Sequence, residues 1–182
     1  MSKHKYFEEQ ISSDIIYTGK IINCCLDSVK LPNEKIAQRE VVLHSGGVVI
    51  IPITKDNKFV MVEQYRYCIN QALLEFPAGR LDKKNESPEL AAIRELSEET
   101  GYKAKVIEEL SYIFTAPGFS SEKLYVFLAT DLEKGEKHPD EDEFVDIVYL
   151  TVDELKEKIR KFEITDAKTL AAYSLFLSRI IQ

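Results

Sequence analysis

The strongest constraint on the fold is a glycine loop followed by a helix that carries three carboxylates on one face. Residues 75–82 read Glu-Phe-Pro-Ala-Gly-Arg-Leu-Asp, and residues 94–101 read Arg-Glu-Leu-Ser-Glu-Glu-Thr-Gly. At ~100° per residue in a helix, Glu98 and Glu99 lie about 60° and about 40° to either side of Glu95. The remaining arc carries the apolar residues Leu90, Ala92, Ile93 and Leu96. The helix therefore has one acidic face and one face suited to a core.

The crowding of these carboxylates suggests a bound cation. Like charges at i,i+4 on a helix destabilise it by a few tenths of a kcal/mol, and a bound ion removes that repulsion. Ligands that are all oxygen select a hard ion, so the pattern predicts Mg²⁺, with Mn²⁺ as a substitute. The alternative is a solvated charged face on which Arg94 pairs with Glu98.

Local signals mark both ends of the helix. Ser87 is a good N-cap, Pro88 suits the first helical position, and Gly101 is a C-terminal stop. The carboxylates are therefore expected on a rigid element.

The segment before the helix predicts a close approach to a ligand. Residues 73–78 read as a strand that ends at Pro77, because proline has no N–H for a strand ladder. The carbonyl of Ala78 and the backbone of Gly79 are then able to approach a ligand closely. A backbone oxygen beside three carboxylates completes a plausible ion site.

Composition and charge predict a globular enzyme for a small ligand. The 182 residues fit one domain, and contents of 45% hydrophobic and 30% charged residues are ordinary. A net charge of -7 argues against nucleic acid and favours a small phosphorylated ligand held by local arginines. No apolar run approaches a membrane span, and residues 1–9 lack a signal core. Cys24, Cys25 and Cys68 are odd in number and poorly placed for a disulfide, so we expect a cytoplasmic protein with reduced thiols.

Apolar runs and turn signals predict the other elements. Helices flanking a mixed sheet imply an α+β sandwich. Strands are expected over residues 15–29 and 36–44, over residues 48–53 and 59–67 as a pair around the turn 55–58, and over residues 103–110, 124–130 and 144–150. Helices are expected over residues 152–162 and 165–180.

A longer stretch resembles the Nudix box, in which a glycine, a spacer and a glutamate precede Arg-Glu-aliphatic-x-Glu-Glu-x-Gly-aliphatic. Here Glu86 is followed by seven residues and then by the matching run that starts at Arg94. Two positions depart from the motif: six residues instead of five separate Gly79 from Glu86, and Tyr102 replaces the last aliphatic residue. The extra residue falls in the polar turn 82–85, where loops accept insertions easily.

The resemblance extends from Tyr17 to Leu177. Over this range the sequence is similar to the ADP-ribose pyrophosphatase branch of the Nudix family. A proline beyond the box marks this branch, and Pro117 stands there. The short motifs that carry the resemblance lie at residues 39–42, 63–67, 74–79, 116–122 and 140–144.

This resemblance implies the Nudix fold, an α+β fold in which a mixed β-sheet is sandwiched between helices. It adds an N-terminal antiparallel strand extension. The implied domains are residues 1–45, an extension for dimerisation that forms part of the substrate pocket, and residues 46–182, the Nudix hydrolase domain.

The same resemblance implies roles for the box residues. The carbonyl of Ala78 and the carboxylates of Glu95 and Glu99 would be the inner metal ligands. Glu98 would be a further ligand or an acceptor behind them.

Substrate contacts are implied outside the helix as well. Arg66 would bind the diphosphate, because its planar fork of donors matches phosphate oxygens; without the resemblance it reads as a surface strand residue. Arg39 would lie near the adenine or its ribose, Glu122 near the terminal ribose, and Gly79 and Pro117 along the substrate.

The acidic loop at residues 140–143 supplies the candidate general base. By the resemblance, Glu143 is the first candidate, Glu141 is the second, and the proton would otherwise go to Glu98 of the helix. A solvated acidic loop with no catalytic role is the alternative.

We therefore expect metal-dependent hydrolysis of the diphosphate of ADP-ribose to AMP and ribose 5-phosphate. The alternatives are a pyrophosphatase for another nucleoside diphosphate sugar and a Nudix module that binds a nucleotide without hydrolysis. Retention of Glu95, Glu98 and Glu99 argues against the second alternative. The expected partners are a small nucleoside diphosphate sugar and a second copy in a homodimer, with neither nucleic acid nor membrane. The sequence does not rank bases or sugars.

Overall fold

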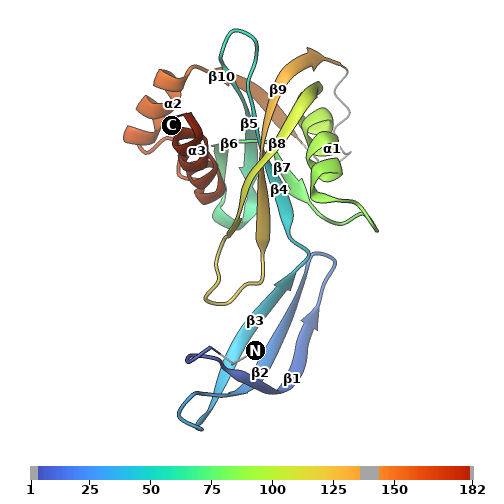
Figure 1. Ribbon diagram of the computed structural model, residues 1–182, viewed down its shortest axis with the longest axis vertical. Helices are drawn as coiled ribbons and strands as arrows, with labels where there is room; N and C mark the ends of the chain where they lie inside the picture. The colour runs from blue at the N-terminus through green and yellow to red at the C-terminus, as the bar shows by residue number, and fades with distance from the viewer. Residues whose placement is uncertain (1–3, 136–143, 181–182) are drawn as a thin grey trace. The chain divides into compact units, whose positions relative to one another are not determined.

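The structure is a computed structural model that describes residues 4–135 and 144–180 (Figure 1). The described residues divide into two compact units, of which the first comprises residues 4–46 and 114–123 and the second comprises the rest. The first unit thus includes a segment from the middle of the chain that the sequence assigned to the hydrolase domain. The domain boundary expected after residue 45 stays a prediction.

The first unit is built on an antiparallel sheet in the order β1-β2-β3. The prediction of one strand over residues 15–29 is wrong, because the N–H of Gly19 donates to the carbonyl of Ile22 at 2.9 Å and closes a turn. Gly19 stands alone inside an apolar run and is a weak turn signal, so the sequence did not predict this hairpin. The strands are β1 (Glu9–Thr18), β2 (Ile22–Lys30) and β3 (Ile36–His44).

The second unit contains two sheets. One is mixed and has the order β7-β4-β9-β8, with β4 parallel to β9 and antiparallel to β7. The other has the order β10-β5-β6 and is antiparallel. The strands are β4 (Gly47–Pro52), β5 (Phe59–Arg66), β6 (Gln71–Glu75), β7 (Ala78–Arg80), β8 (Tyr102–Phe114), β9 (Lys123–Lys134) and β10 (Val145–Leu150), and a 3-10 turn, η1 (Tyr67–Ile69), joins β5 to β6.

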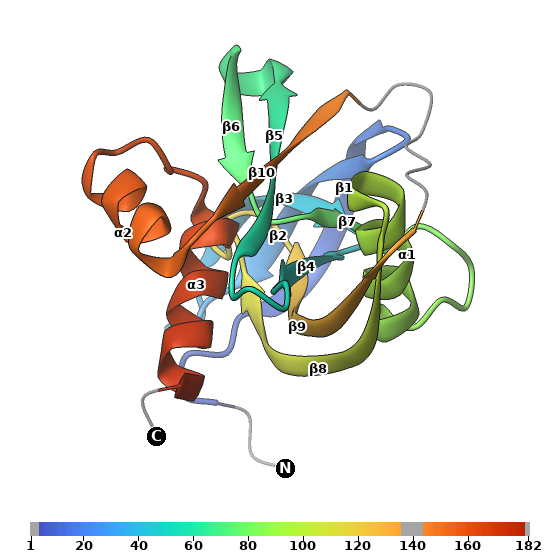
Figure 2. The ribbon, with the colours of Figure 1, turned by 90° about the horizontal axis from the view of Figure 1, so that it is seen from above.

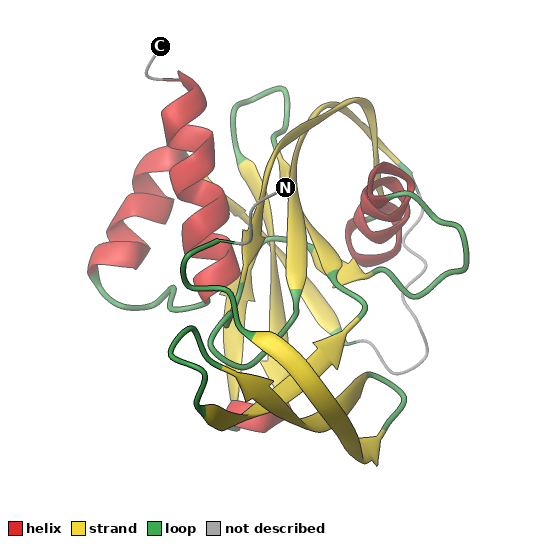
Figure 3. Cartoon of the chain, turned by 60° about the horizontal axis from the view of Figure 1, so that its bottom comes forward, coloured by secondary structure: helices red, strands yellow, loops and turns green. Residues whose placement is uncertain are grey.

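Helices cover both sides of these strands. Helix α1 (Pro88–Thr100) lies on one side, and helices α2 (Val152–Arg160) and α3 (Ala167–Ile180) lie on the other, as Figure 2 and Figure 3 show. The predicted α+β sandwich is confirmed. Within the described residues, no helix has the length and apolar character needed to cross a membrane.

Strand β4 lies at the centre of the core, which explains its unbroken apolar sequence. All six of its residues are buried, as expected for a strand covered on both faces. Its side chains alternate between two clusters: Val49 and Ile51 pack with residues of α2 and α3, whereas Val48 and Ile50 pack with Ala91, Ala92 and Leu96 of α1. The expected apolar face of α1 is therefore partly wrong, because Leu90 and Ile93 are 56% and 39% exposed while Ala91 is buried.

Two strand pairings differ from the prediction. Strands β4 and β5 belong to different sheets and share only the bridge between Ile53 and Phe59. The strand expected over residues 73–78 is two strands, because β6 pairs with β5 and β7 pairs with β4. At the crossing, the carbonyl of Pro77 accepts the N–H of Ile50 at 2.8 Å. This crossing places the following loop at the edge of the mixed sheet.

The end signals of α1 are confirmed. The hydroxyl of Ser87 accepts the N–H of Leu90 at 3.2 Å, and Pro88 occupies the first helical position. Gly101 takes the left-handed conformation with φ of 71°, which glycine adopts without strain, and ends the helix. The acidic residues of α1 are therefore held on a helix with well-defined ends.

Candidate active site

The acidic face of α1 lies directly against Ala78 and Gly79, which the sequence places in a loop and the structure places in the short edge strand β7. Glu95 and Glu99 are 7% and 2% exposed, although carboxylates are seldom buried without partners. One oxygen of Glu99 accepts the N–H of Ala78 at 3.2 Å. A β-carbon added at Gly79 would lie only 1.9 Å from the carboxyl carbon of Glu95. The Glu95 carboxylate therefore occupies the space that a side chain at position 79 would fill, and a larger residue there has to displace the end of Glu95.

We expect Gly79→Ala to lower the free energy of unfolding by about 1–3 kcal/mol, the range for a forced fit in a packed site. The added methyl group must displace the Glu95 carboxylate, since no other group lies as close. Gly118→Ala is the matched control, because a β-carbon there meets nothing within 4 Å. Urea unfolding of both variants checks this, and equal stability of the two variants would contradict the contact.

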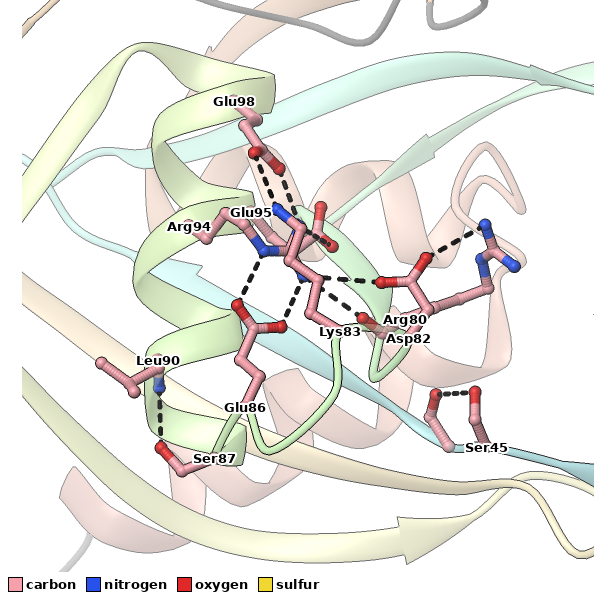
Figure 4. A network of polar contacts seen from close by, with 11 residues as sticks. Ser45, Arg80, Asp82, Lys83, Glu86, Ser87, Leu90, Arg94, Glu95 and Glu98 are labelled. Carbon is pink, nitrogen blue, oxygen red and sulfur yellow. Dashed lines mark hydrogen bonds and ion pairs between the residues drawn. The ribbon is translucent and has the colours of Figure 1, made fainter.

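Arg94 holds the acidic residues of the box together (Figure 4). Its Nε and Nη2 donate to the two oxygens of Glu86, each at 2.9 Å. Its Nη1 donates to Glu95 at 2.6 Å and to Glu98 at 2.8 Å. The expected pairing of Arg94 with Glu98 is present, but as one part of a larger cluster. Glu86, which follows the extra spacer residue, binds Arg94 with both oxygens.

This cluster shifts the titration of its members. The hydrogen bonds from Arg94 hold the pKa of the Glu86 carboxyl below its usual 4.5, while Glu86 and its acidic neighbours raise the pKa of Arg94. A carboxyl whose pKa is lower in the folded state stabilises the fold above its unfolded pKa. That contribution is lost as the pH falls through the folded pKa.

We expect Glu86→Gln to destabilise the protein at pH 7 by about 1–3 kcal/mol, the range for losing a charged hydrogen bond. The difference from wild type should shrink below about pH 4.5 and vanish once Glu86 is protonated in both states. Denaturant unfolding in the presence of a chelator at pH 7 and pH 3 measures it. Glu89→Gln, an exposed change on the same helix, is the control; a difference for Glu86→Gln that persists unchanged at pH 3 would exclude an ionic cause.

Arg66 lies in a second charged group that the sequence did not predict. Its Nε and Nη2 donate to Glu75 at 2.8 Å and 2.5 Å. Glu75 has no exposed surface and also accepts from Lys168, which in turn contacts Asp166 at 3.0 Å. The hydrogen bond to Glu75 is the largest cause of the raised pKa of Arg66, and Glu99 contributes to it as well. The one sequence feature that indicates this group is Glu75 itself, a glutamate inside the apolar run that precedes Pro77.

The other predicted substrate residues lie in the first unit. Arg39 donates to both oxygens of Glu8, at 2.9 Å and 2.7 Å. Glu122 accepts the hydroxyl of Thr115 at 2.6 Å, and Pro117 lies in the turn between β8 and β9. The structure thus brings together the loop and helix residues of the second unit, while these three residues belong to the other unit. Glu141 and Glu143 lie outside the described residues.

The donor chemistry of the loop and helix fits a hard divalent cation. The available groups are the carbonyl of Ala78 and the carboxylates of Glu95, Glu98 and Glu99, all of them oxygens. The glycine cradle and the burial of Glu95 and Glu99 also suit an ion site. Within residues 4–135 and 144–180, however, no three acidic, histidine or cysteine side chains converge in a metal-holding arrangement. Glu95 and Glu98 are directed to Arg94 instead, so a cation has to compete with this arginine.

Comparison with known proteins places this geometry in a family. The NUDIX domain family profile matches residues 43–173. A methanol dehydrogenase activator from Bacillus methanolicus is 44% identical, with 92% of each chain covered. An ADP-ribose pyrophosphatase from Bacillus subtilis is 40% identical, with 91% of this chain and 90% of that protein covered. A solved ADP compounds hydrolase has a TM-score of 0.83 at 23% identity, with 98% of this chain and 95% of that one covered, which shows the fold. Both the fold and the sequence relatives agree with the resemblance of the box, and the chain belongs to the Nudix hydrolase family.

Proposed function

We propose that the protein hydrolyses the diphosphate of ADP-ribose to AMP and ribose 5-phosphate with the aid of a divalent cation. The observation that carries this proposal is the convergence of buried Glu95 and Glu99 on the backbone at Ala78 and Gly79. Oxygen ligands on a rigid helix beside a backbone carbonyl suit a diphosphate substrate that brings its own oxygens to a cation. The relatives named as ADP-ribose pyrophosphatases support the choice of substrate.

The residues that would hold the cation are Ala78 through its carbonyl, Glu95 and Glu99, with Glu98 as a further ligand or an acceptor. Mg²⁺ is the proposed ion, with Mn²⁺ as a substitute. When bound, such a cation neutralises charge on the phosphoryl groups and lowers the pKa of a water molecule. Arg94, itself held by Glu86, donates to Glu95 and Glu98, so a cation would have to displace this arginine from their carboxylates.

The remaining proposed roles belong to side chains that contact the substrate. Arg66 binds the diphosphate, Arg39 lies at the adenosine, and Glu122 lies at the terminal ribose. Gly79 and Pro117 line the substrate. Glu143, or failing that Glu141, accepts the proton of the attacking water at its carboxylate, and Glu98 is the third candidate.

A substrate panel tests the proposal. The protein is incubated with ADP-ribose or with GDP-mannose, each with a phosphatase that acts on the monoester products and leaves the intact diphosphate alone. Phosphate release from ADP-ribose is expected with Mg²⁺ and should stop when a chelator is added. Faster phosphate release from GDP-mannose would show that another nucleoside diphosphate sugar is the preferred substrate. No release from either substrate would favour a Nudix module that binds a nucleotide without hydrolysis.

A second candidate function comes from the relative named as a methanol dehydrogenase activator. Its similarity extends along nearly the whole of both chains, so we propose activation of a dehydrogenase as an alternative role. The rate of methanol oxidation by a methanol dehydrogenase is measured with and without this protein. An unchanged rate removes this candidate.

We also propose a homodimer formed through the N-terminal strands. All ten residues of β1 are exposed, and Ile15 and Ile16 are 68% and 67% exposed. An exposed apolar strand at a sheet edge is a template for pairing with another chain. Sedimentation should give a dimer at micromolar concentration, and Ile15→Lys with Ile16→Lys should shift it to monomer. A fully active wild-type monomer would refute the proposal; Lys20→Glu, an exposed change in the β1-β2 turn, is the control.

A further inference from the structure

Glu75 and three other charged side chains form a compact group at the start of α3. Glu75 is completely buried and accepts from Arg66 with both oxygens. Lys168 donates to Glu75 and to Asp166, and it is 15% exposed while Asp166 is 13% exposed. Asp166 also accepts the N–H of Thr169 at 2.9 Å, which caps the helix. The group thus links β5 and β6 to the first turn of α3.

The geometry at Arg66 leaves one edge of its guanidinium available. Nε and Nη2 are both used by Glu75. In the part of the chain that the structure describes, no residue accepts from Nη1. A cavity of about 360 Å³ is lined by Arg66, Glu75, Asp166 and Lys168, together with Tyr65 and other residues of the β5-β6 hairpin. Arg66 is therefore held by Glu75 in one orientation beside an open space.

The charges of the group balance. Arg66 and Lys168 are positive, Glu75 and Asp166 are negative, and all four lie within contact distance of a neighbour in the group. Without Lys168 the group would carry a net negative charge beside the side chain that is to bind a diphosphate. Removing Lys168 would also leave the buried Glu75 carboxylate with only Arg66 to compensate its charge.

We propose that Lys168 is a positioning residue for the substrate diphosphate. By compensating Glu75, it keeps Arg66 both oriented and able to attract a phosphate group. Asp166 opposes this effect, because its negative charge offsets the positive charge of Lys168. The inference rests on the proposed role of Arg66 in ADP-ribose binding, and it deepens that role by adding the first turn of α3 to the diphosphate subsite.

The test measures ADP-ribose binding by calorimetry and KM and kcat by phosphate release. Lys168→Met should raise both Kd and KM about tenfold, the scale for losing one nearby charge at a partly exposed site, with a smaller change in kcat. Lys168→Arg should restore both values. Asp166→Asn keeps an oxygen for the helix cap and should lower KM by about threefold. Lys161→Met is the control, because Lys161 is exposed and its ammonium group pairs with the exposed Glu157.

The outcomes separate this inference from the proposed function. In the Arg66→Ala background, Lys168→Met should have no further effect on Kd, because coupled residues are not additive. Equal Kd and KM for folded Lys168→Met and wild type would overturn the inference while wild-type hydrolysis upholds the function. Changes of the same sign for Lys168→Met and Asp166→Asn would also overturn it. Wild-type binding without hydrolysis would refute the function alone, and no binding by wild type would refute both.

Discussion

Glu99→Gln is expected to lower kcat by at least ~100-fold, which corresponds to ~3 kcal/mol of transition-state stabilisation. Glu99 is buried against the loop, and one of its oxygens accepts the N–H of Ala78. The glutamine has the same size and retains an oxygen for that hydrogen bond, so the fold should persist. What is removed is the negative charge that a cation needs. Substrate binding should suffer less than turnover.

The measurement is kcat as a function of Mg²⁺ concentration for wild type and Glu99→Gln, with circular dichroism to establish folding. Glu89→Gln is the matched control, since Glu89 lies on the same helix but is exposed. It should retain full turnover. Near-normal activity in folded Glu99→Gln would exclude Glu99 as a metal ligand.

Glu143→Gln should lower kcat by ~10²- to 10⁴-fold, the usual range for a positioned general base. The substitution keeps the shape of the side chain and removes only the proton acceptor, so metal affinity should hardly change. Glu141→Gln should have a much smaller effect. Raising the pH should partly restore the Glu143 variant, because hydroxide replaces the missing base.

Turnover against pH and against Mg²⁺ concentration for both variants distinguishes the candidates. If Glu141→Gln has a greatly reduced turnover and Glu143→Gln has a normal one, the general base is Glu141 and not Glu143. If neither variant is impaired, the acidic loop has no catalytic role and Glu98 becomes the candidate. Glu98→Gln is then the next variant to measure, although it also removes a partner of Arg94.

The elements that were predicted well depend on local signals. Helix α1 is capped by Ser87 and Gly101, as predicted, because caps are encoded within a single turn. The contact between Gly79 and Glu95 of the helix agrees with the motif of the box, which pairs the glycine with the acidic helix. By contrast, the hairpin at Gly19 was missed because a short turn between two apolar strands leaves little trace in composition.

The charged group at Glu75 could not be predicted, because its partners are far apart in the sequence. Arg66 precedes Glu75 by nine residues and Lys168 follows it by 93. No period or motif relates such positions: the pairing of β5 with β6 brings Arg66 to Glu75, and the packing of α3 beside β6 brings Lys168 there. A glutamate in an apolar run indicates a buried partner but does not identify it. The roles of Glu141 and Glu143 stay predictions for a different reason, since they lie outside the described residues.

The hydroxyl of Thr169 accepts the N–H of Phe76 at 2.9 Å, and this bond joins the segment before the glycine loop to the last helix of the chain. Both groups are buried, so the amide has no water to replace this partner. On a ribosome, α1 and its acidic face emerge long before α3 is made. A nascent chain therefore carries the whole box before Thr169 is available to accept the N–H of Phe76. This buried amide gains its partner only when the C-terminal helix has been made.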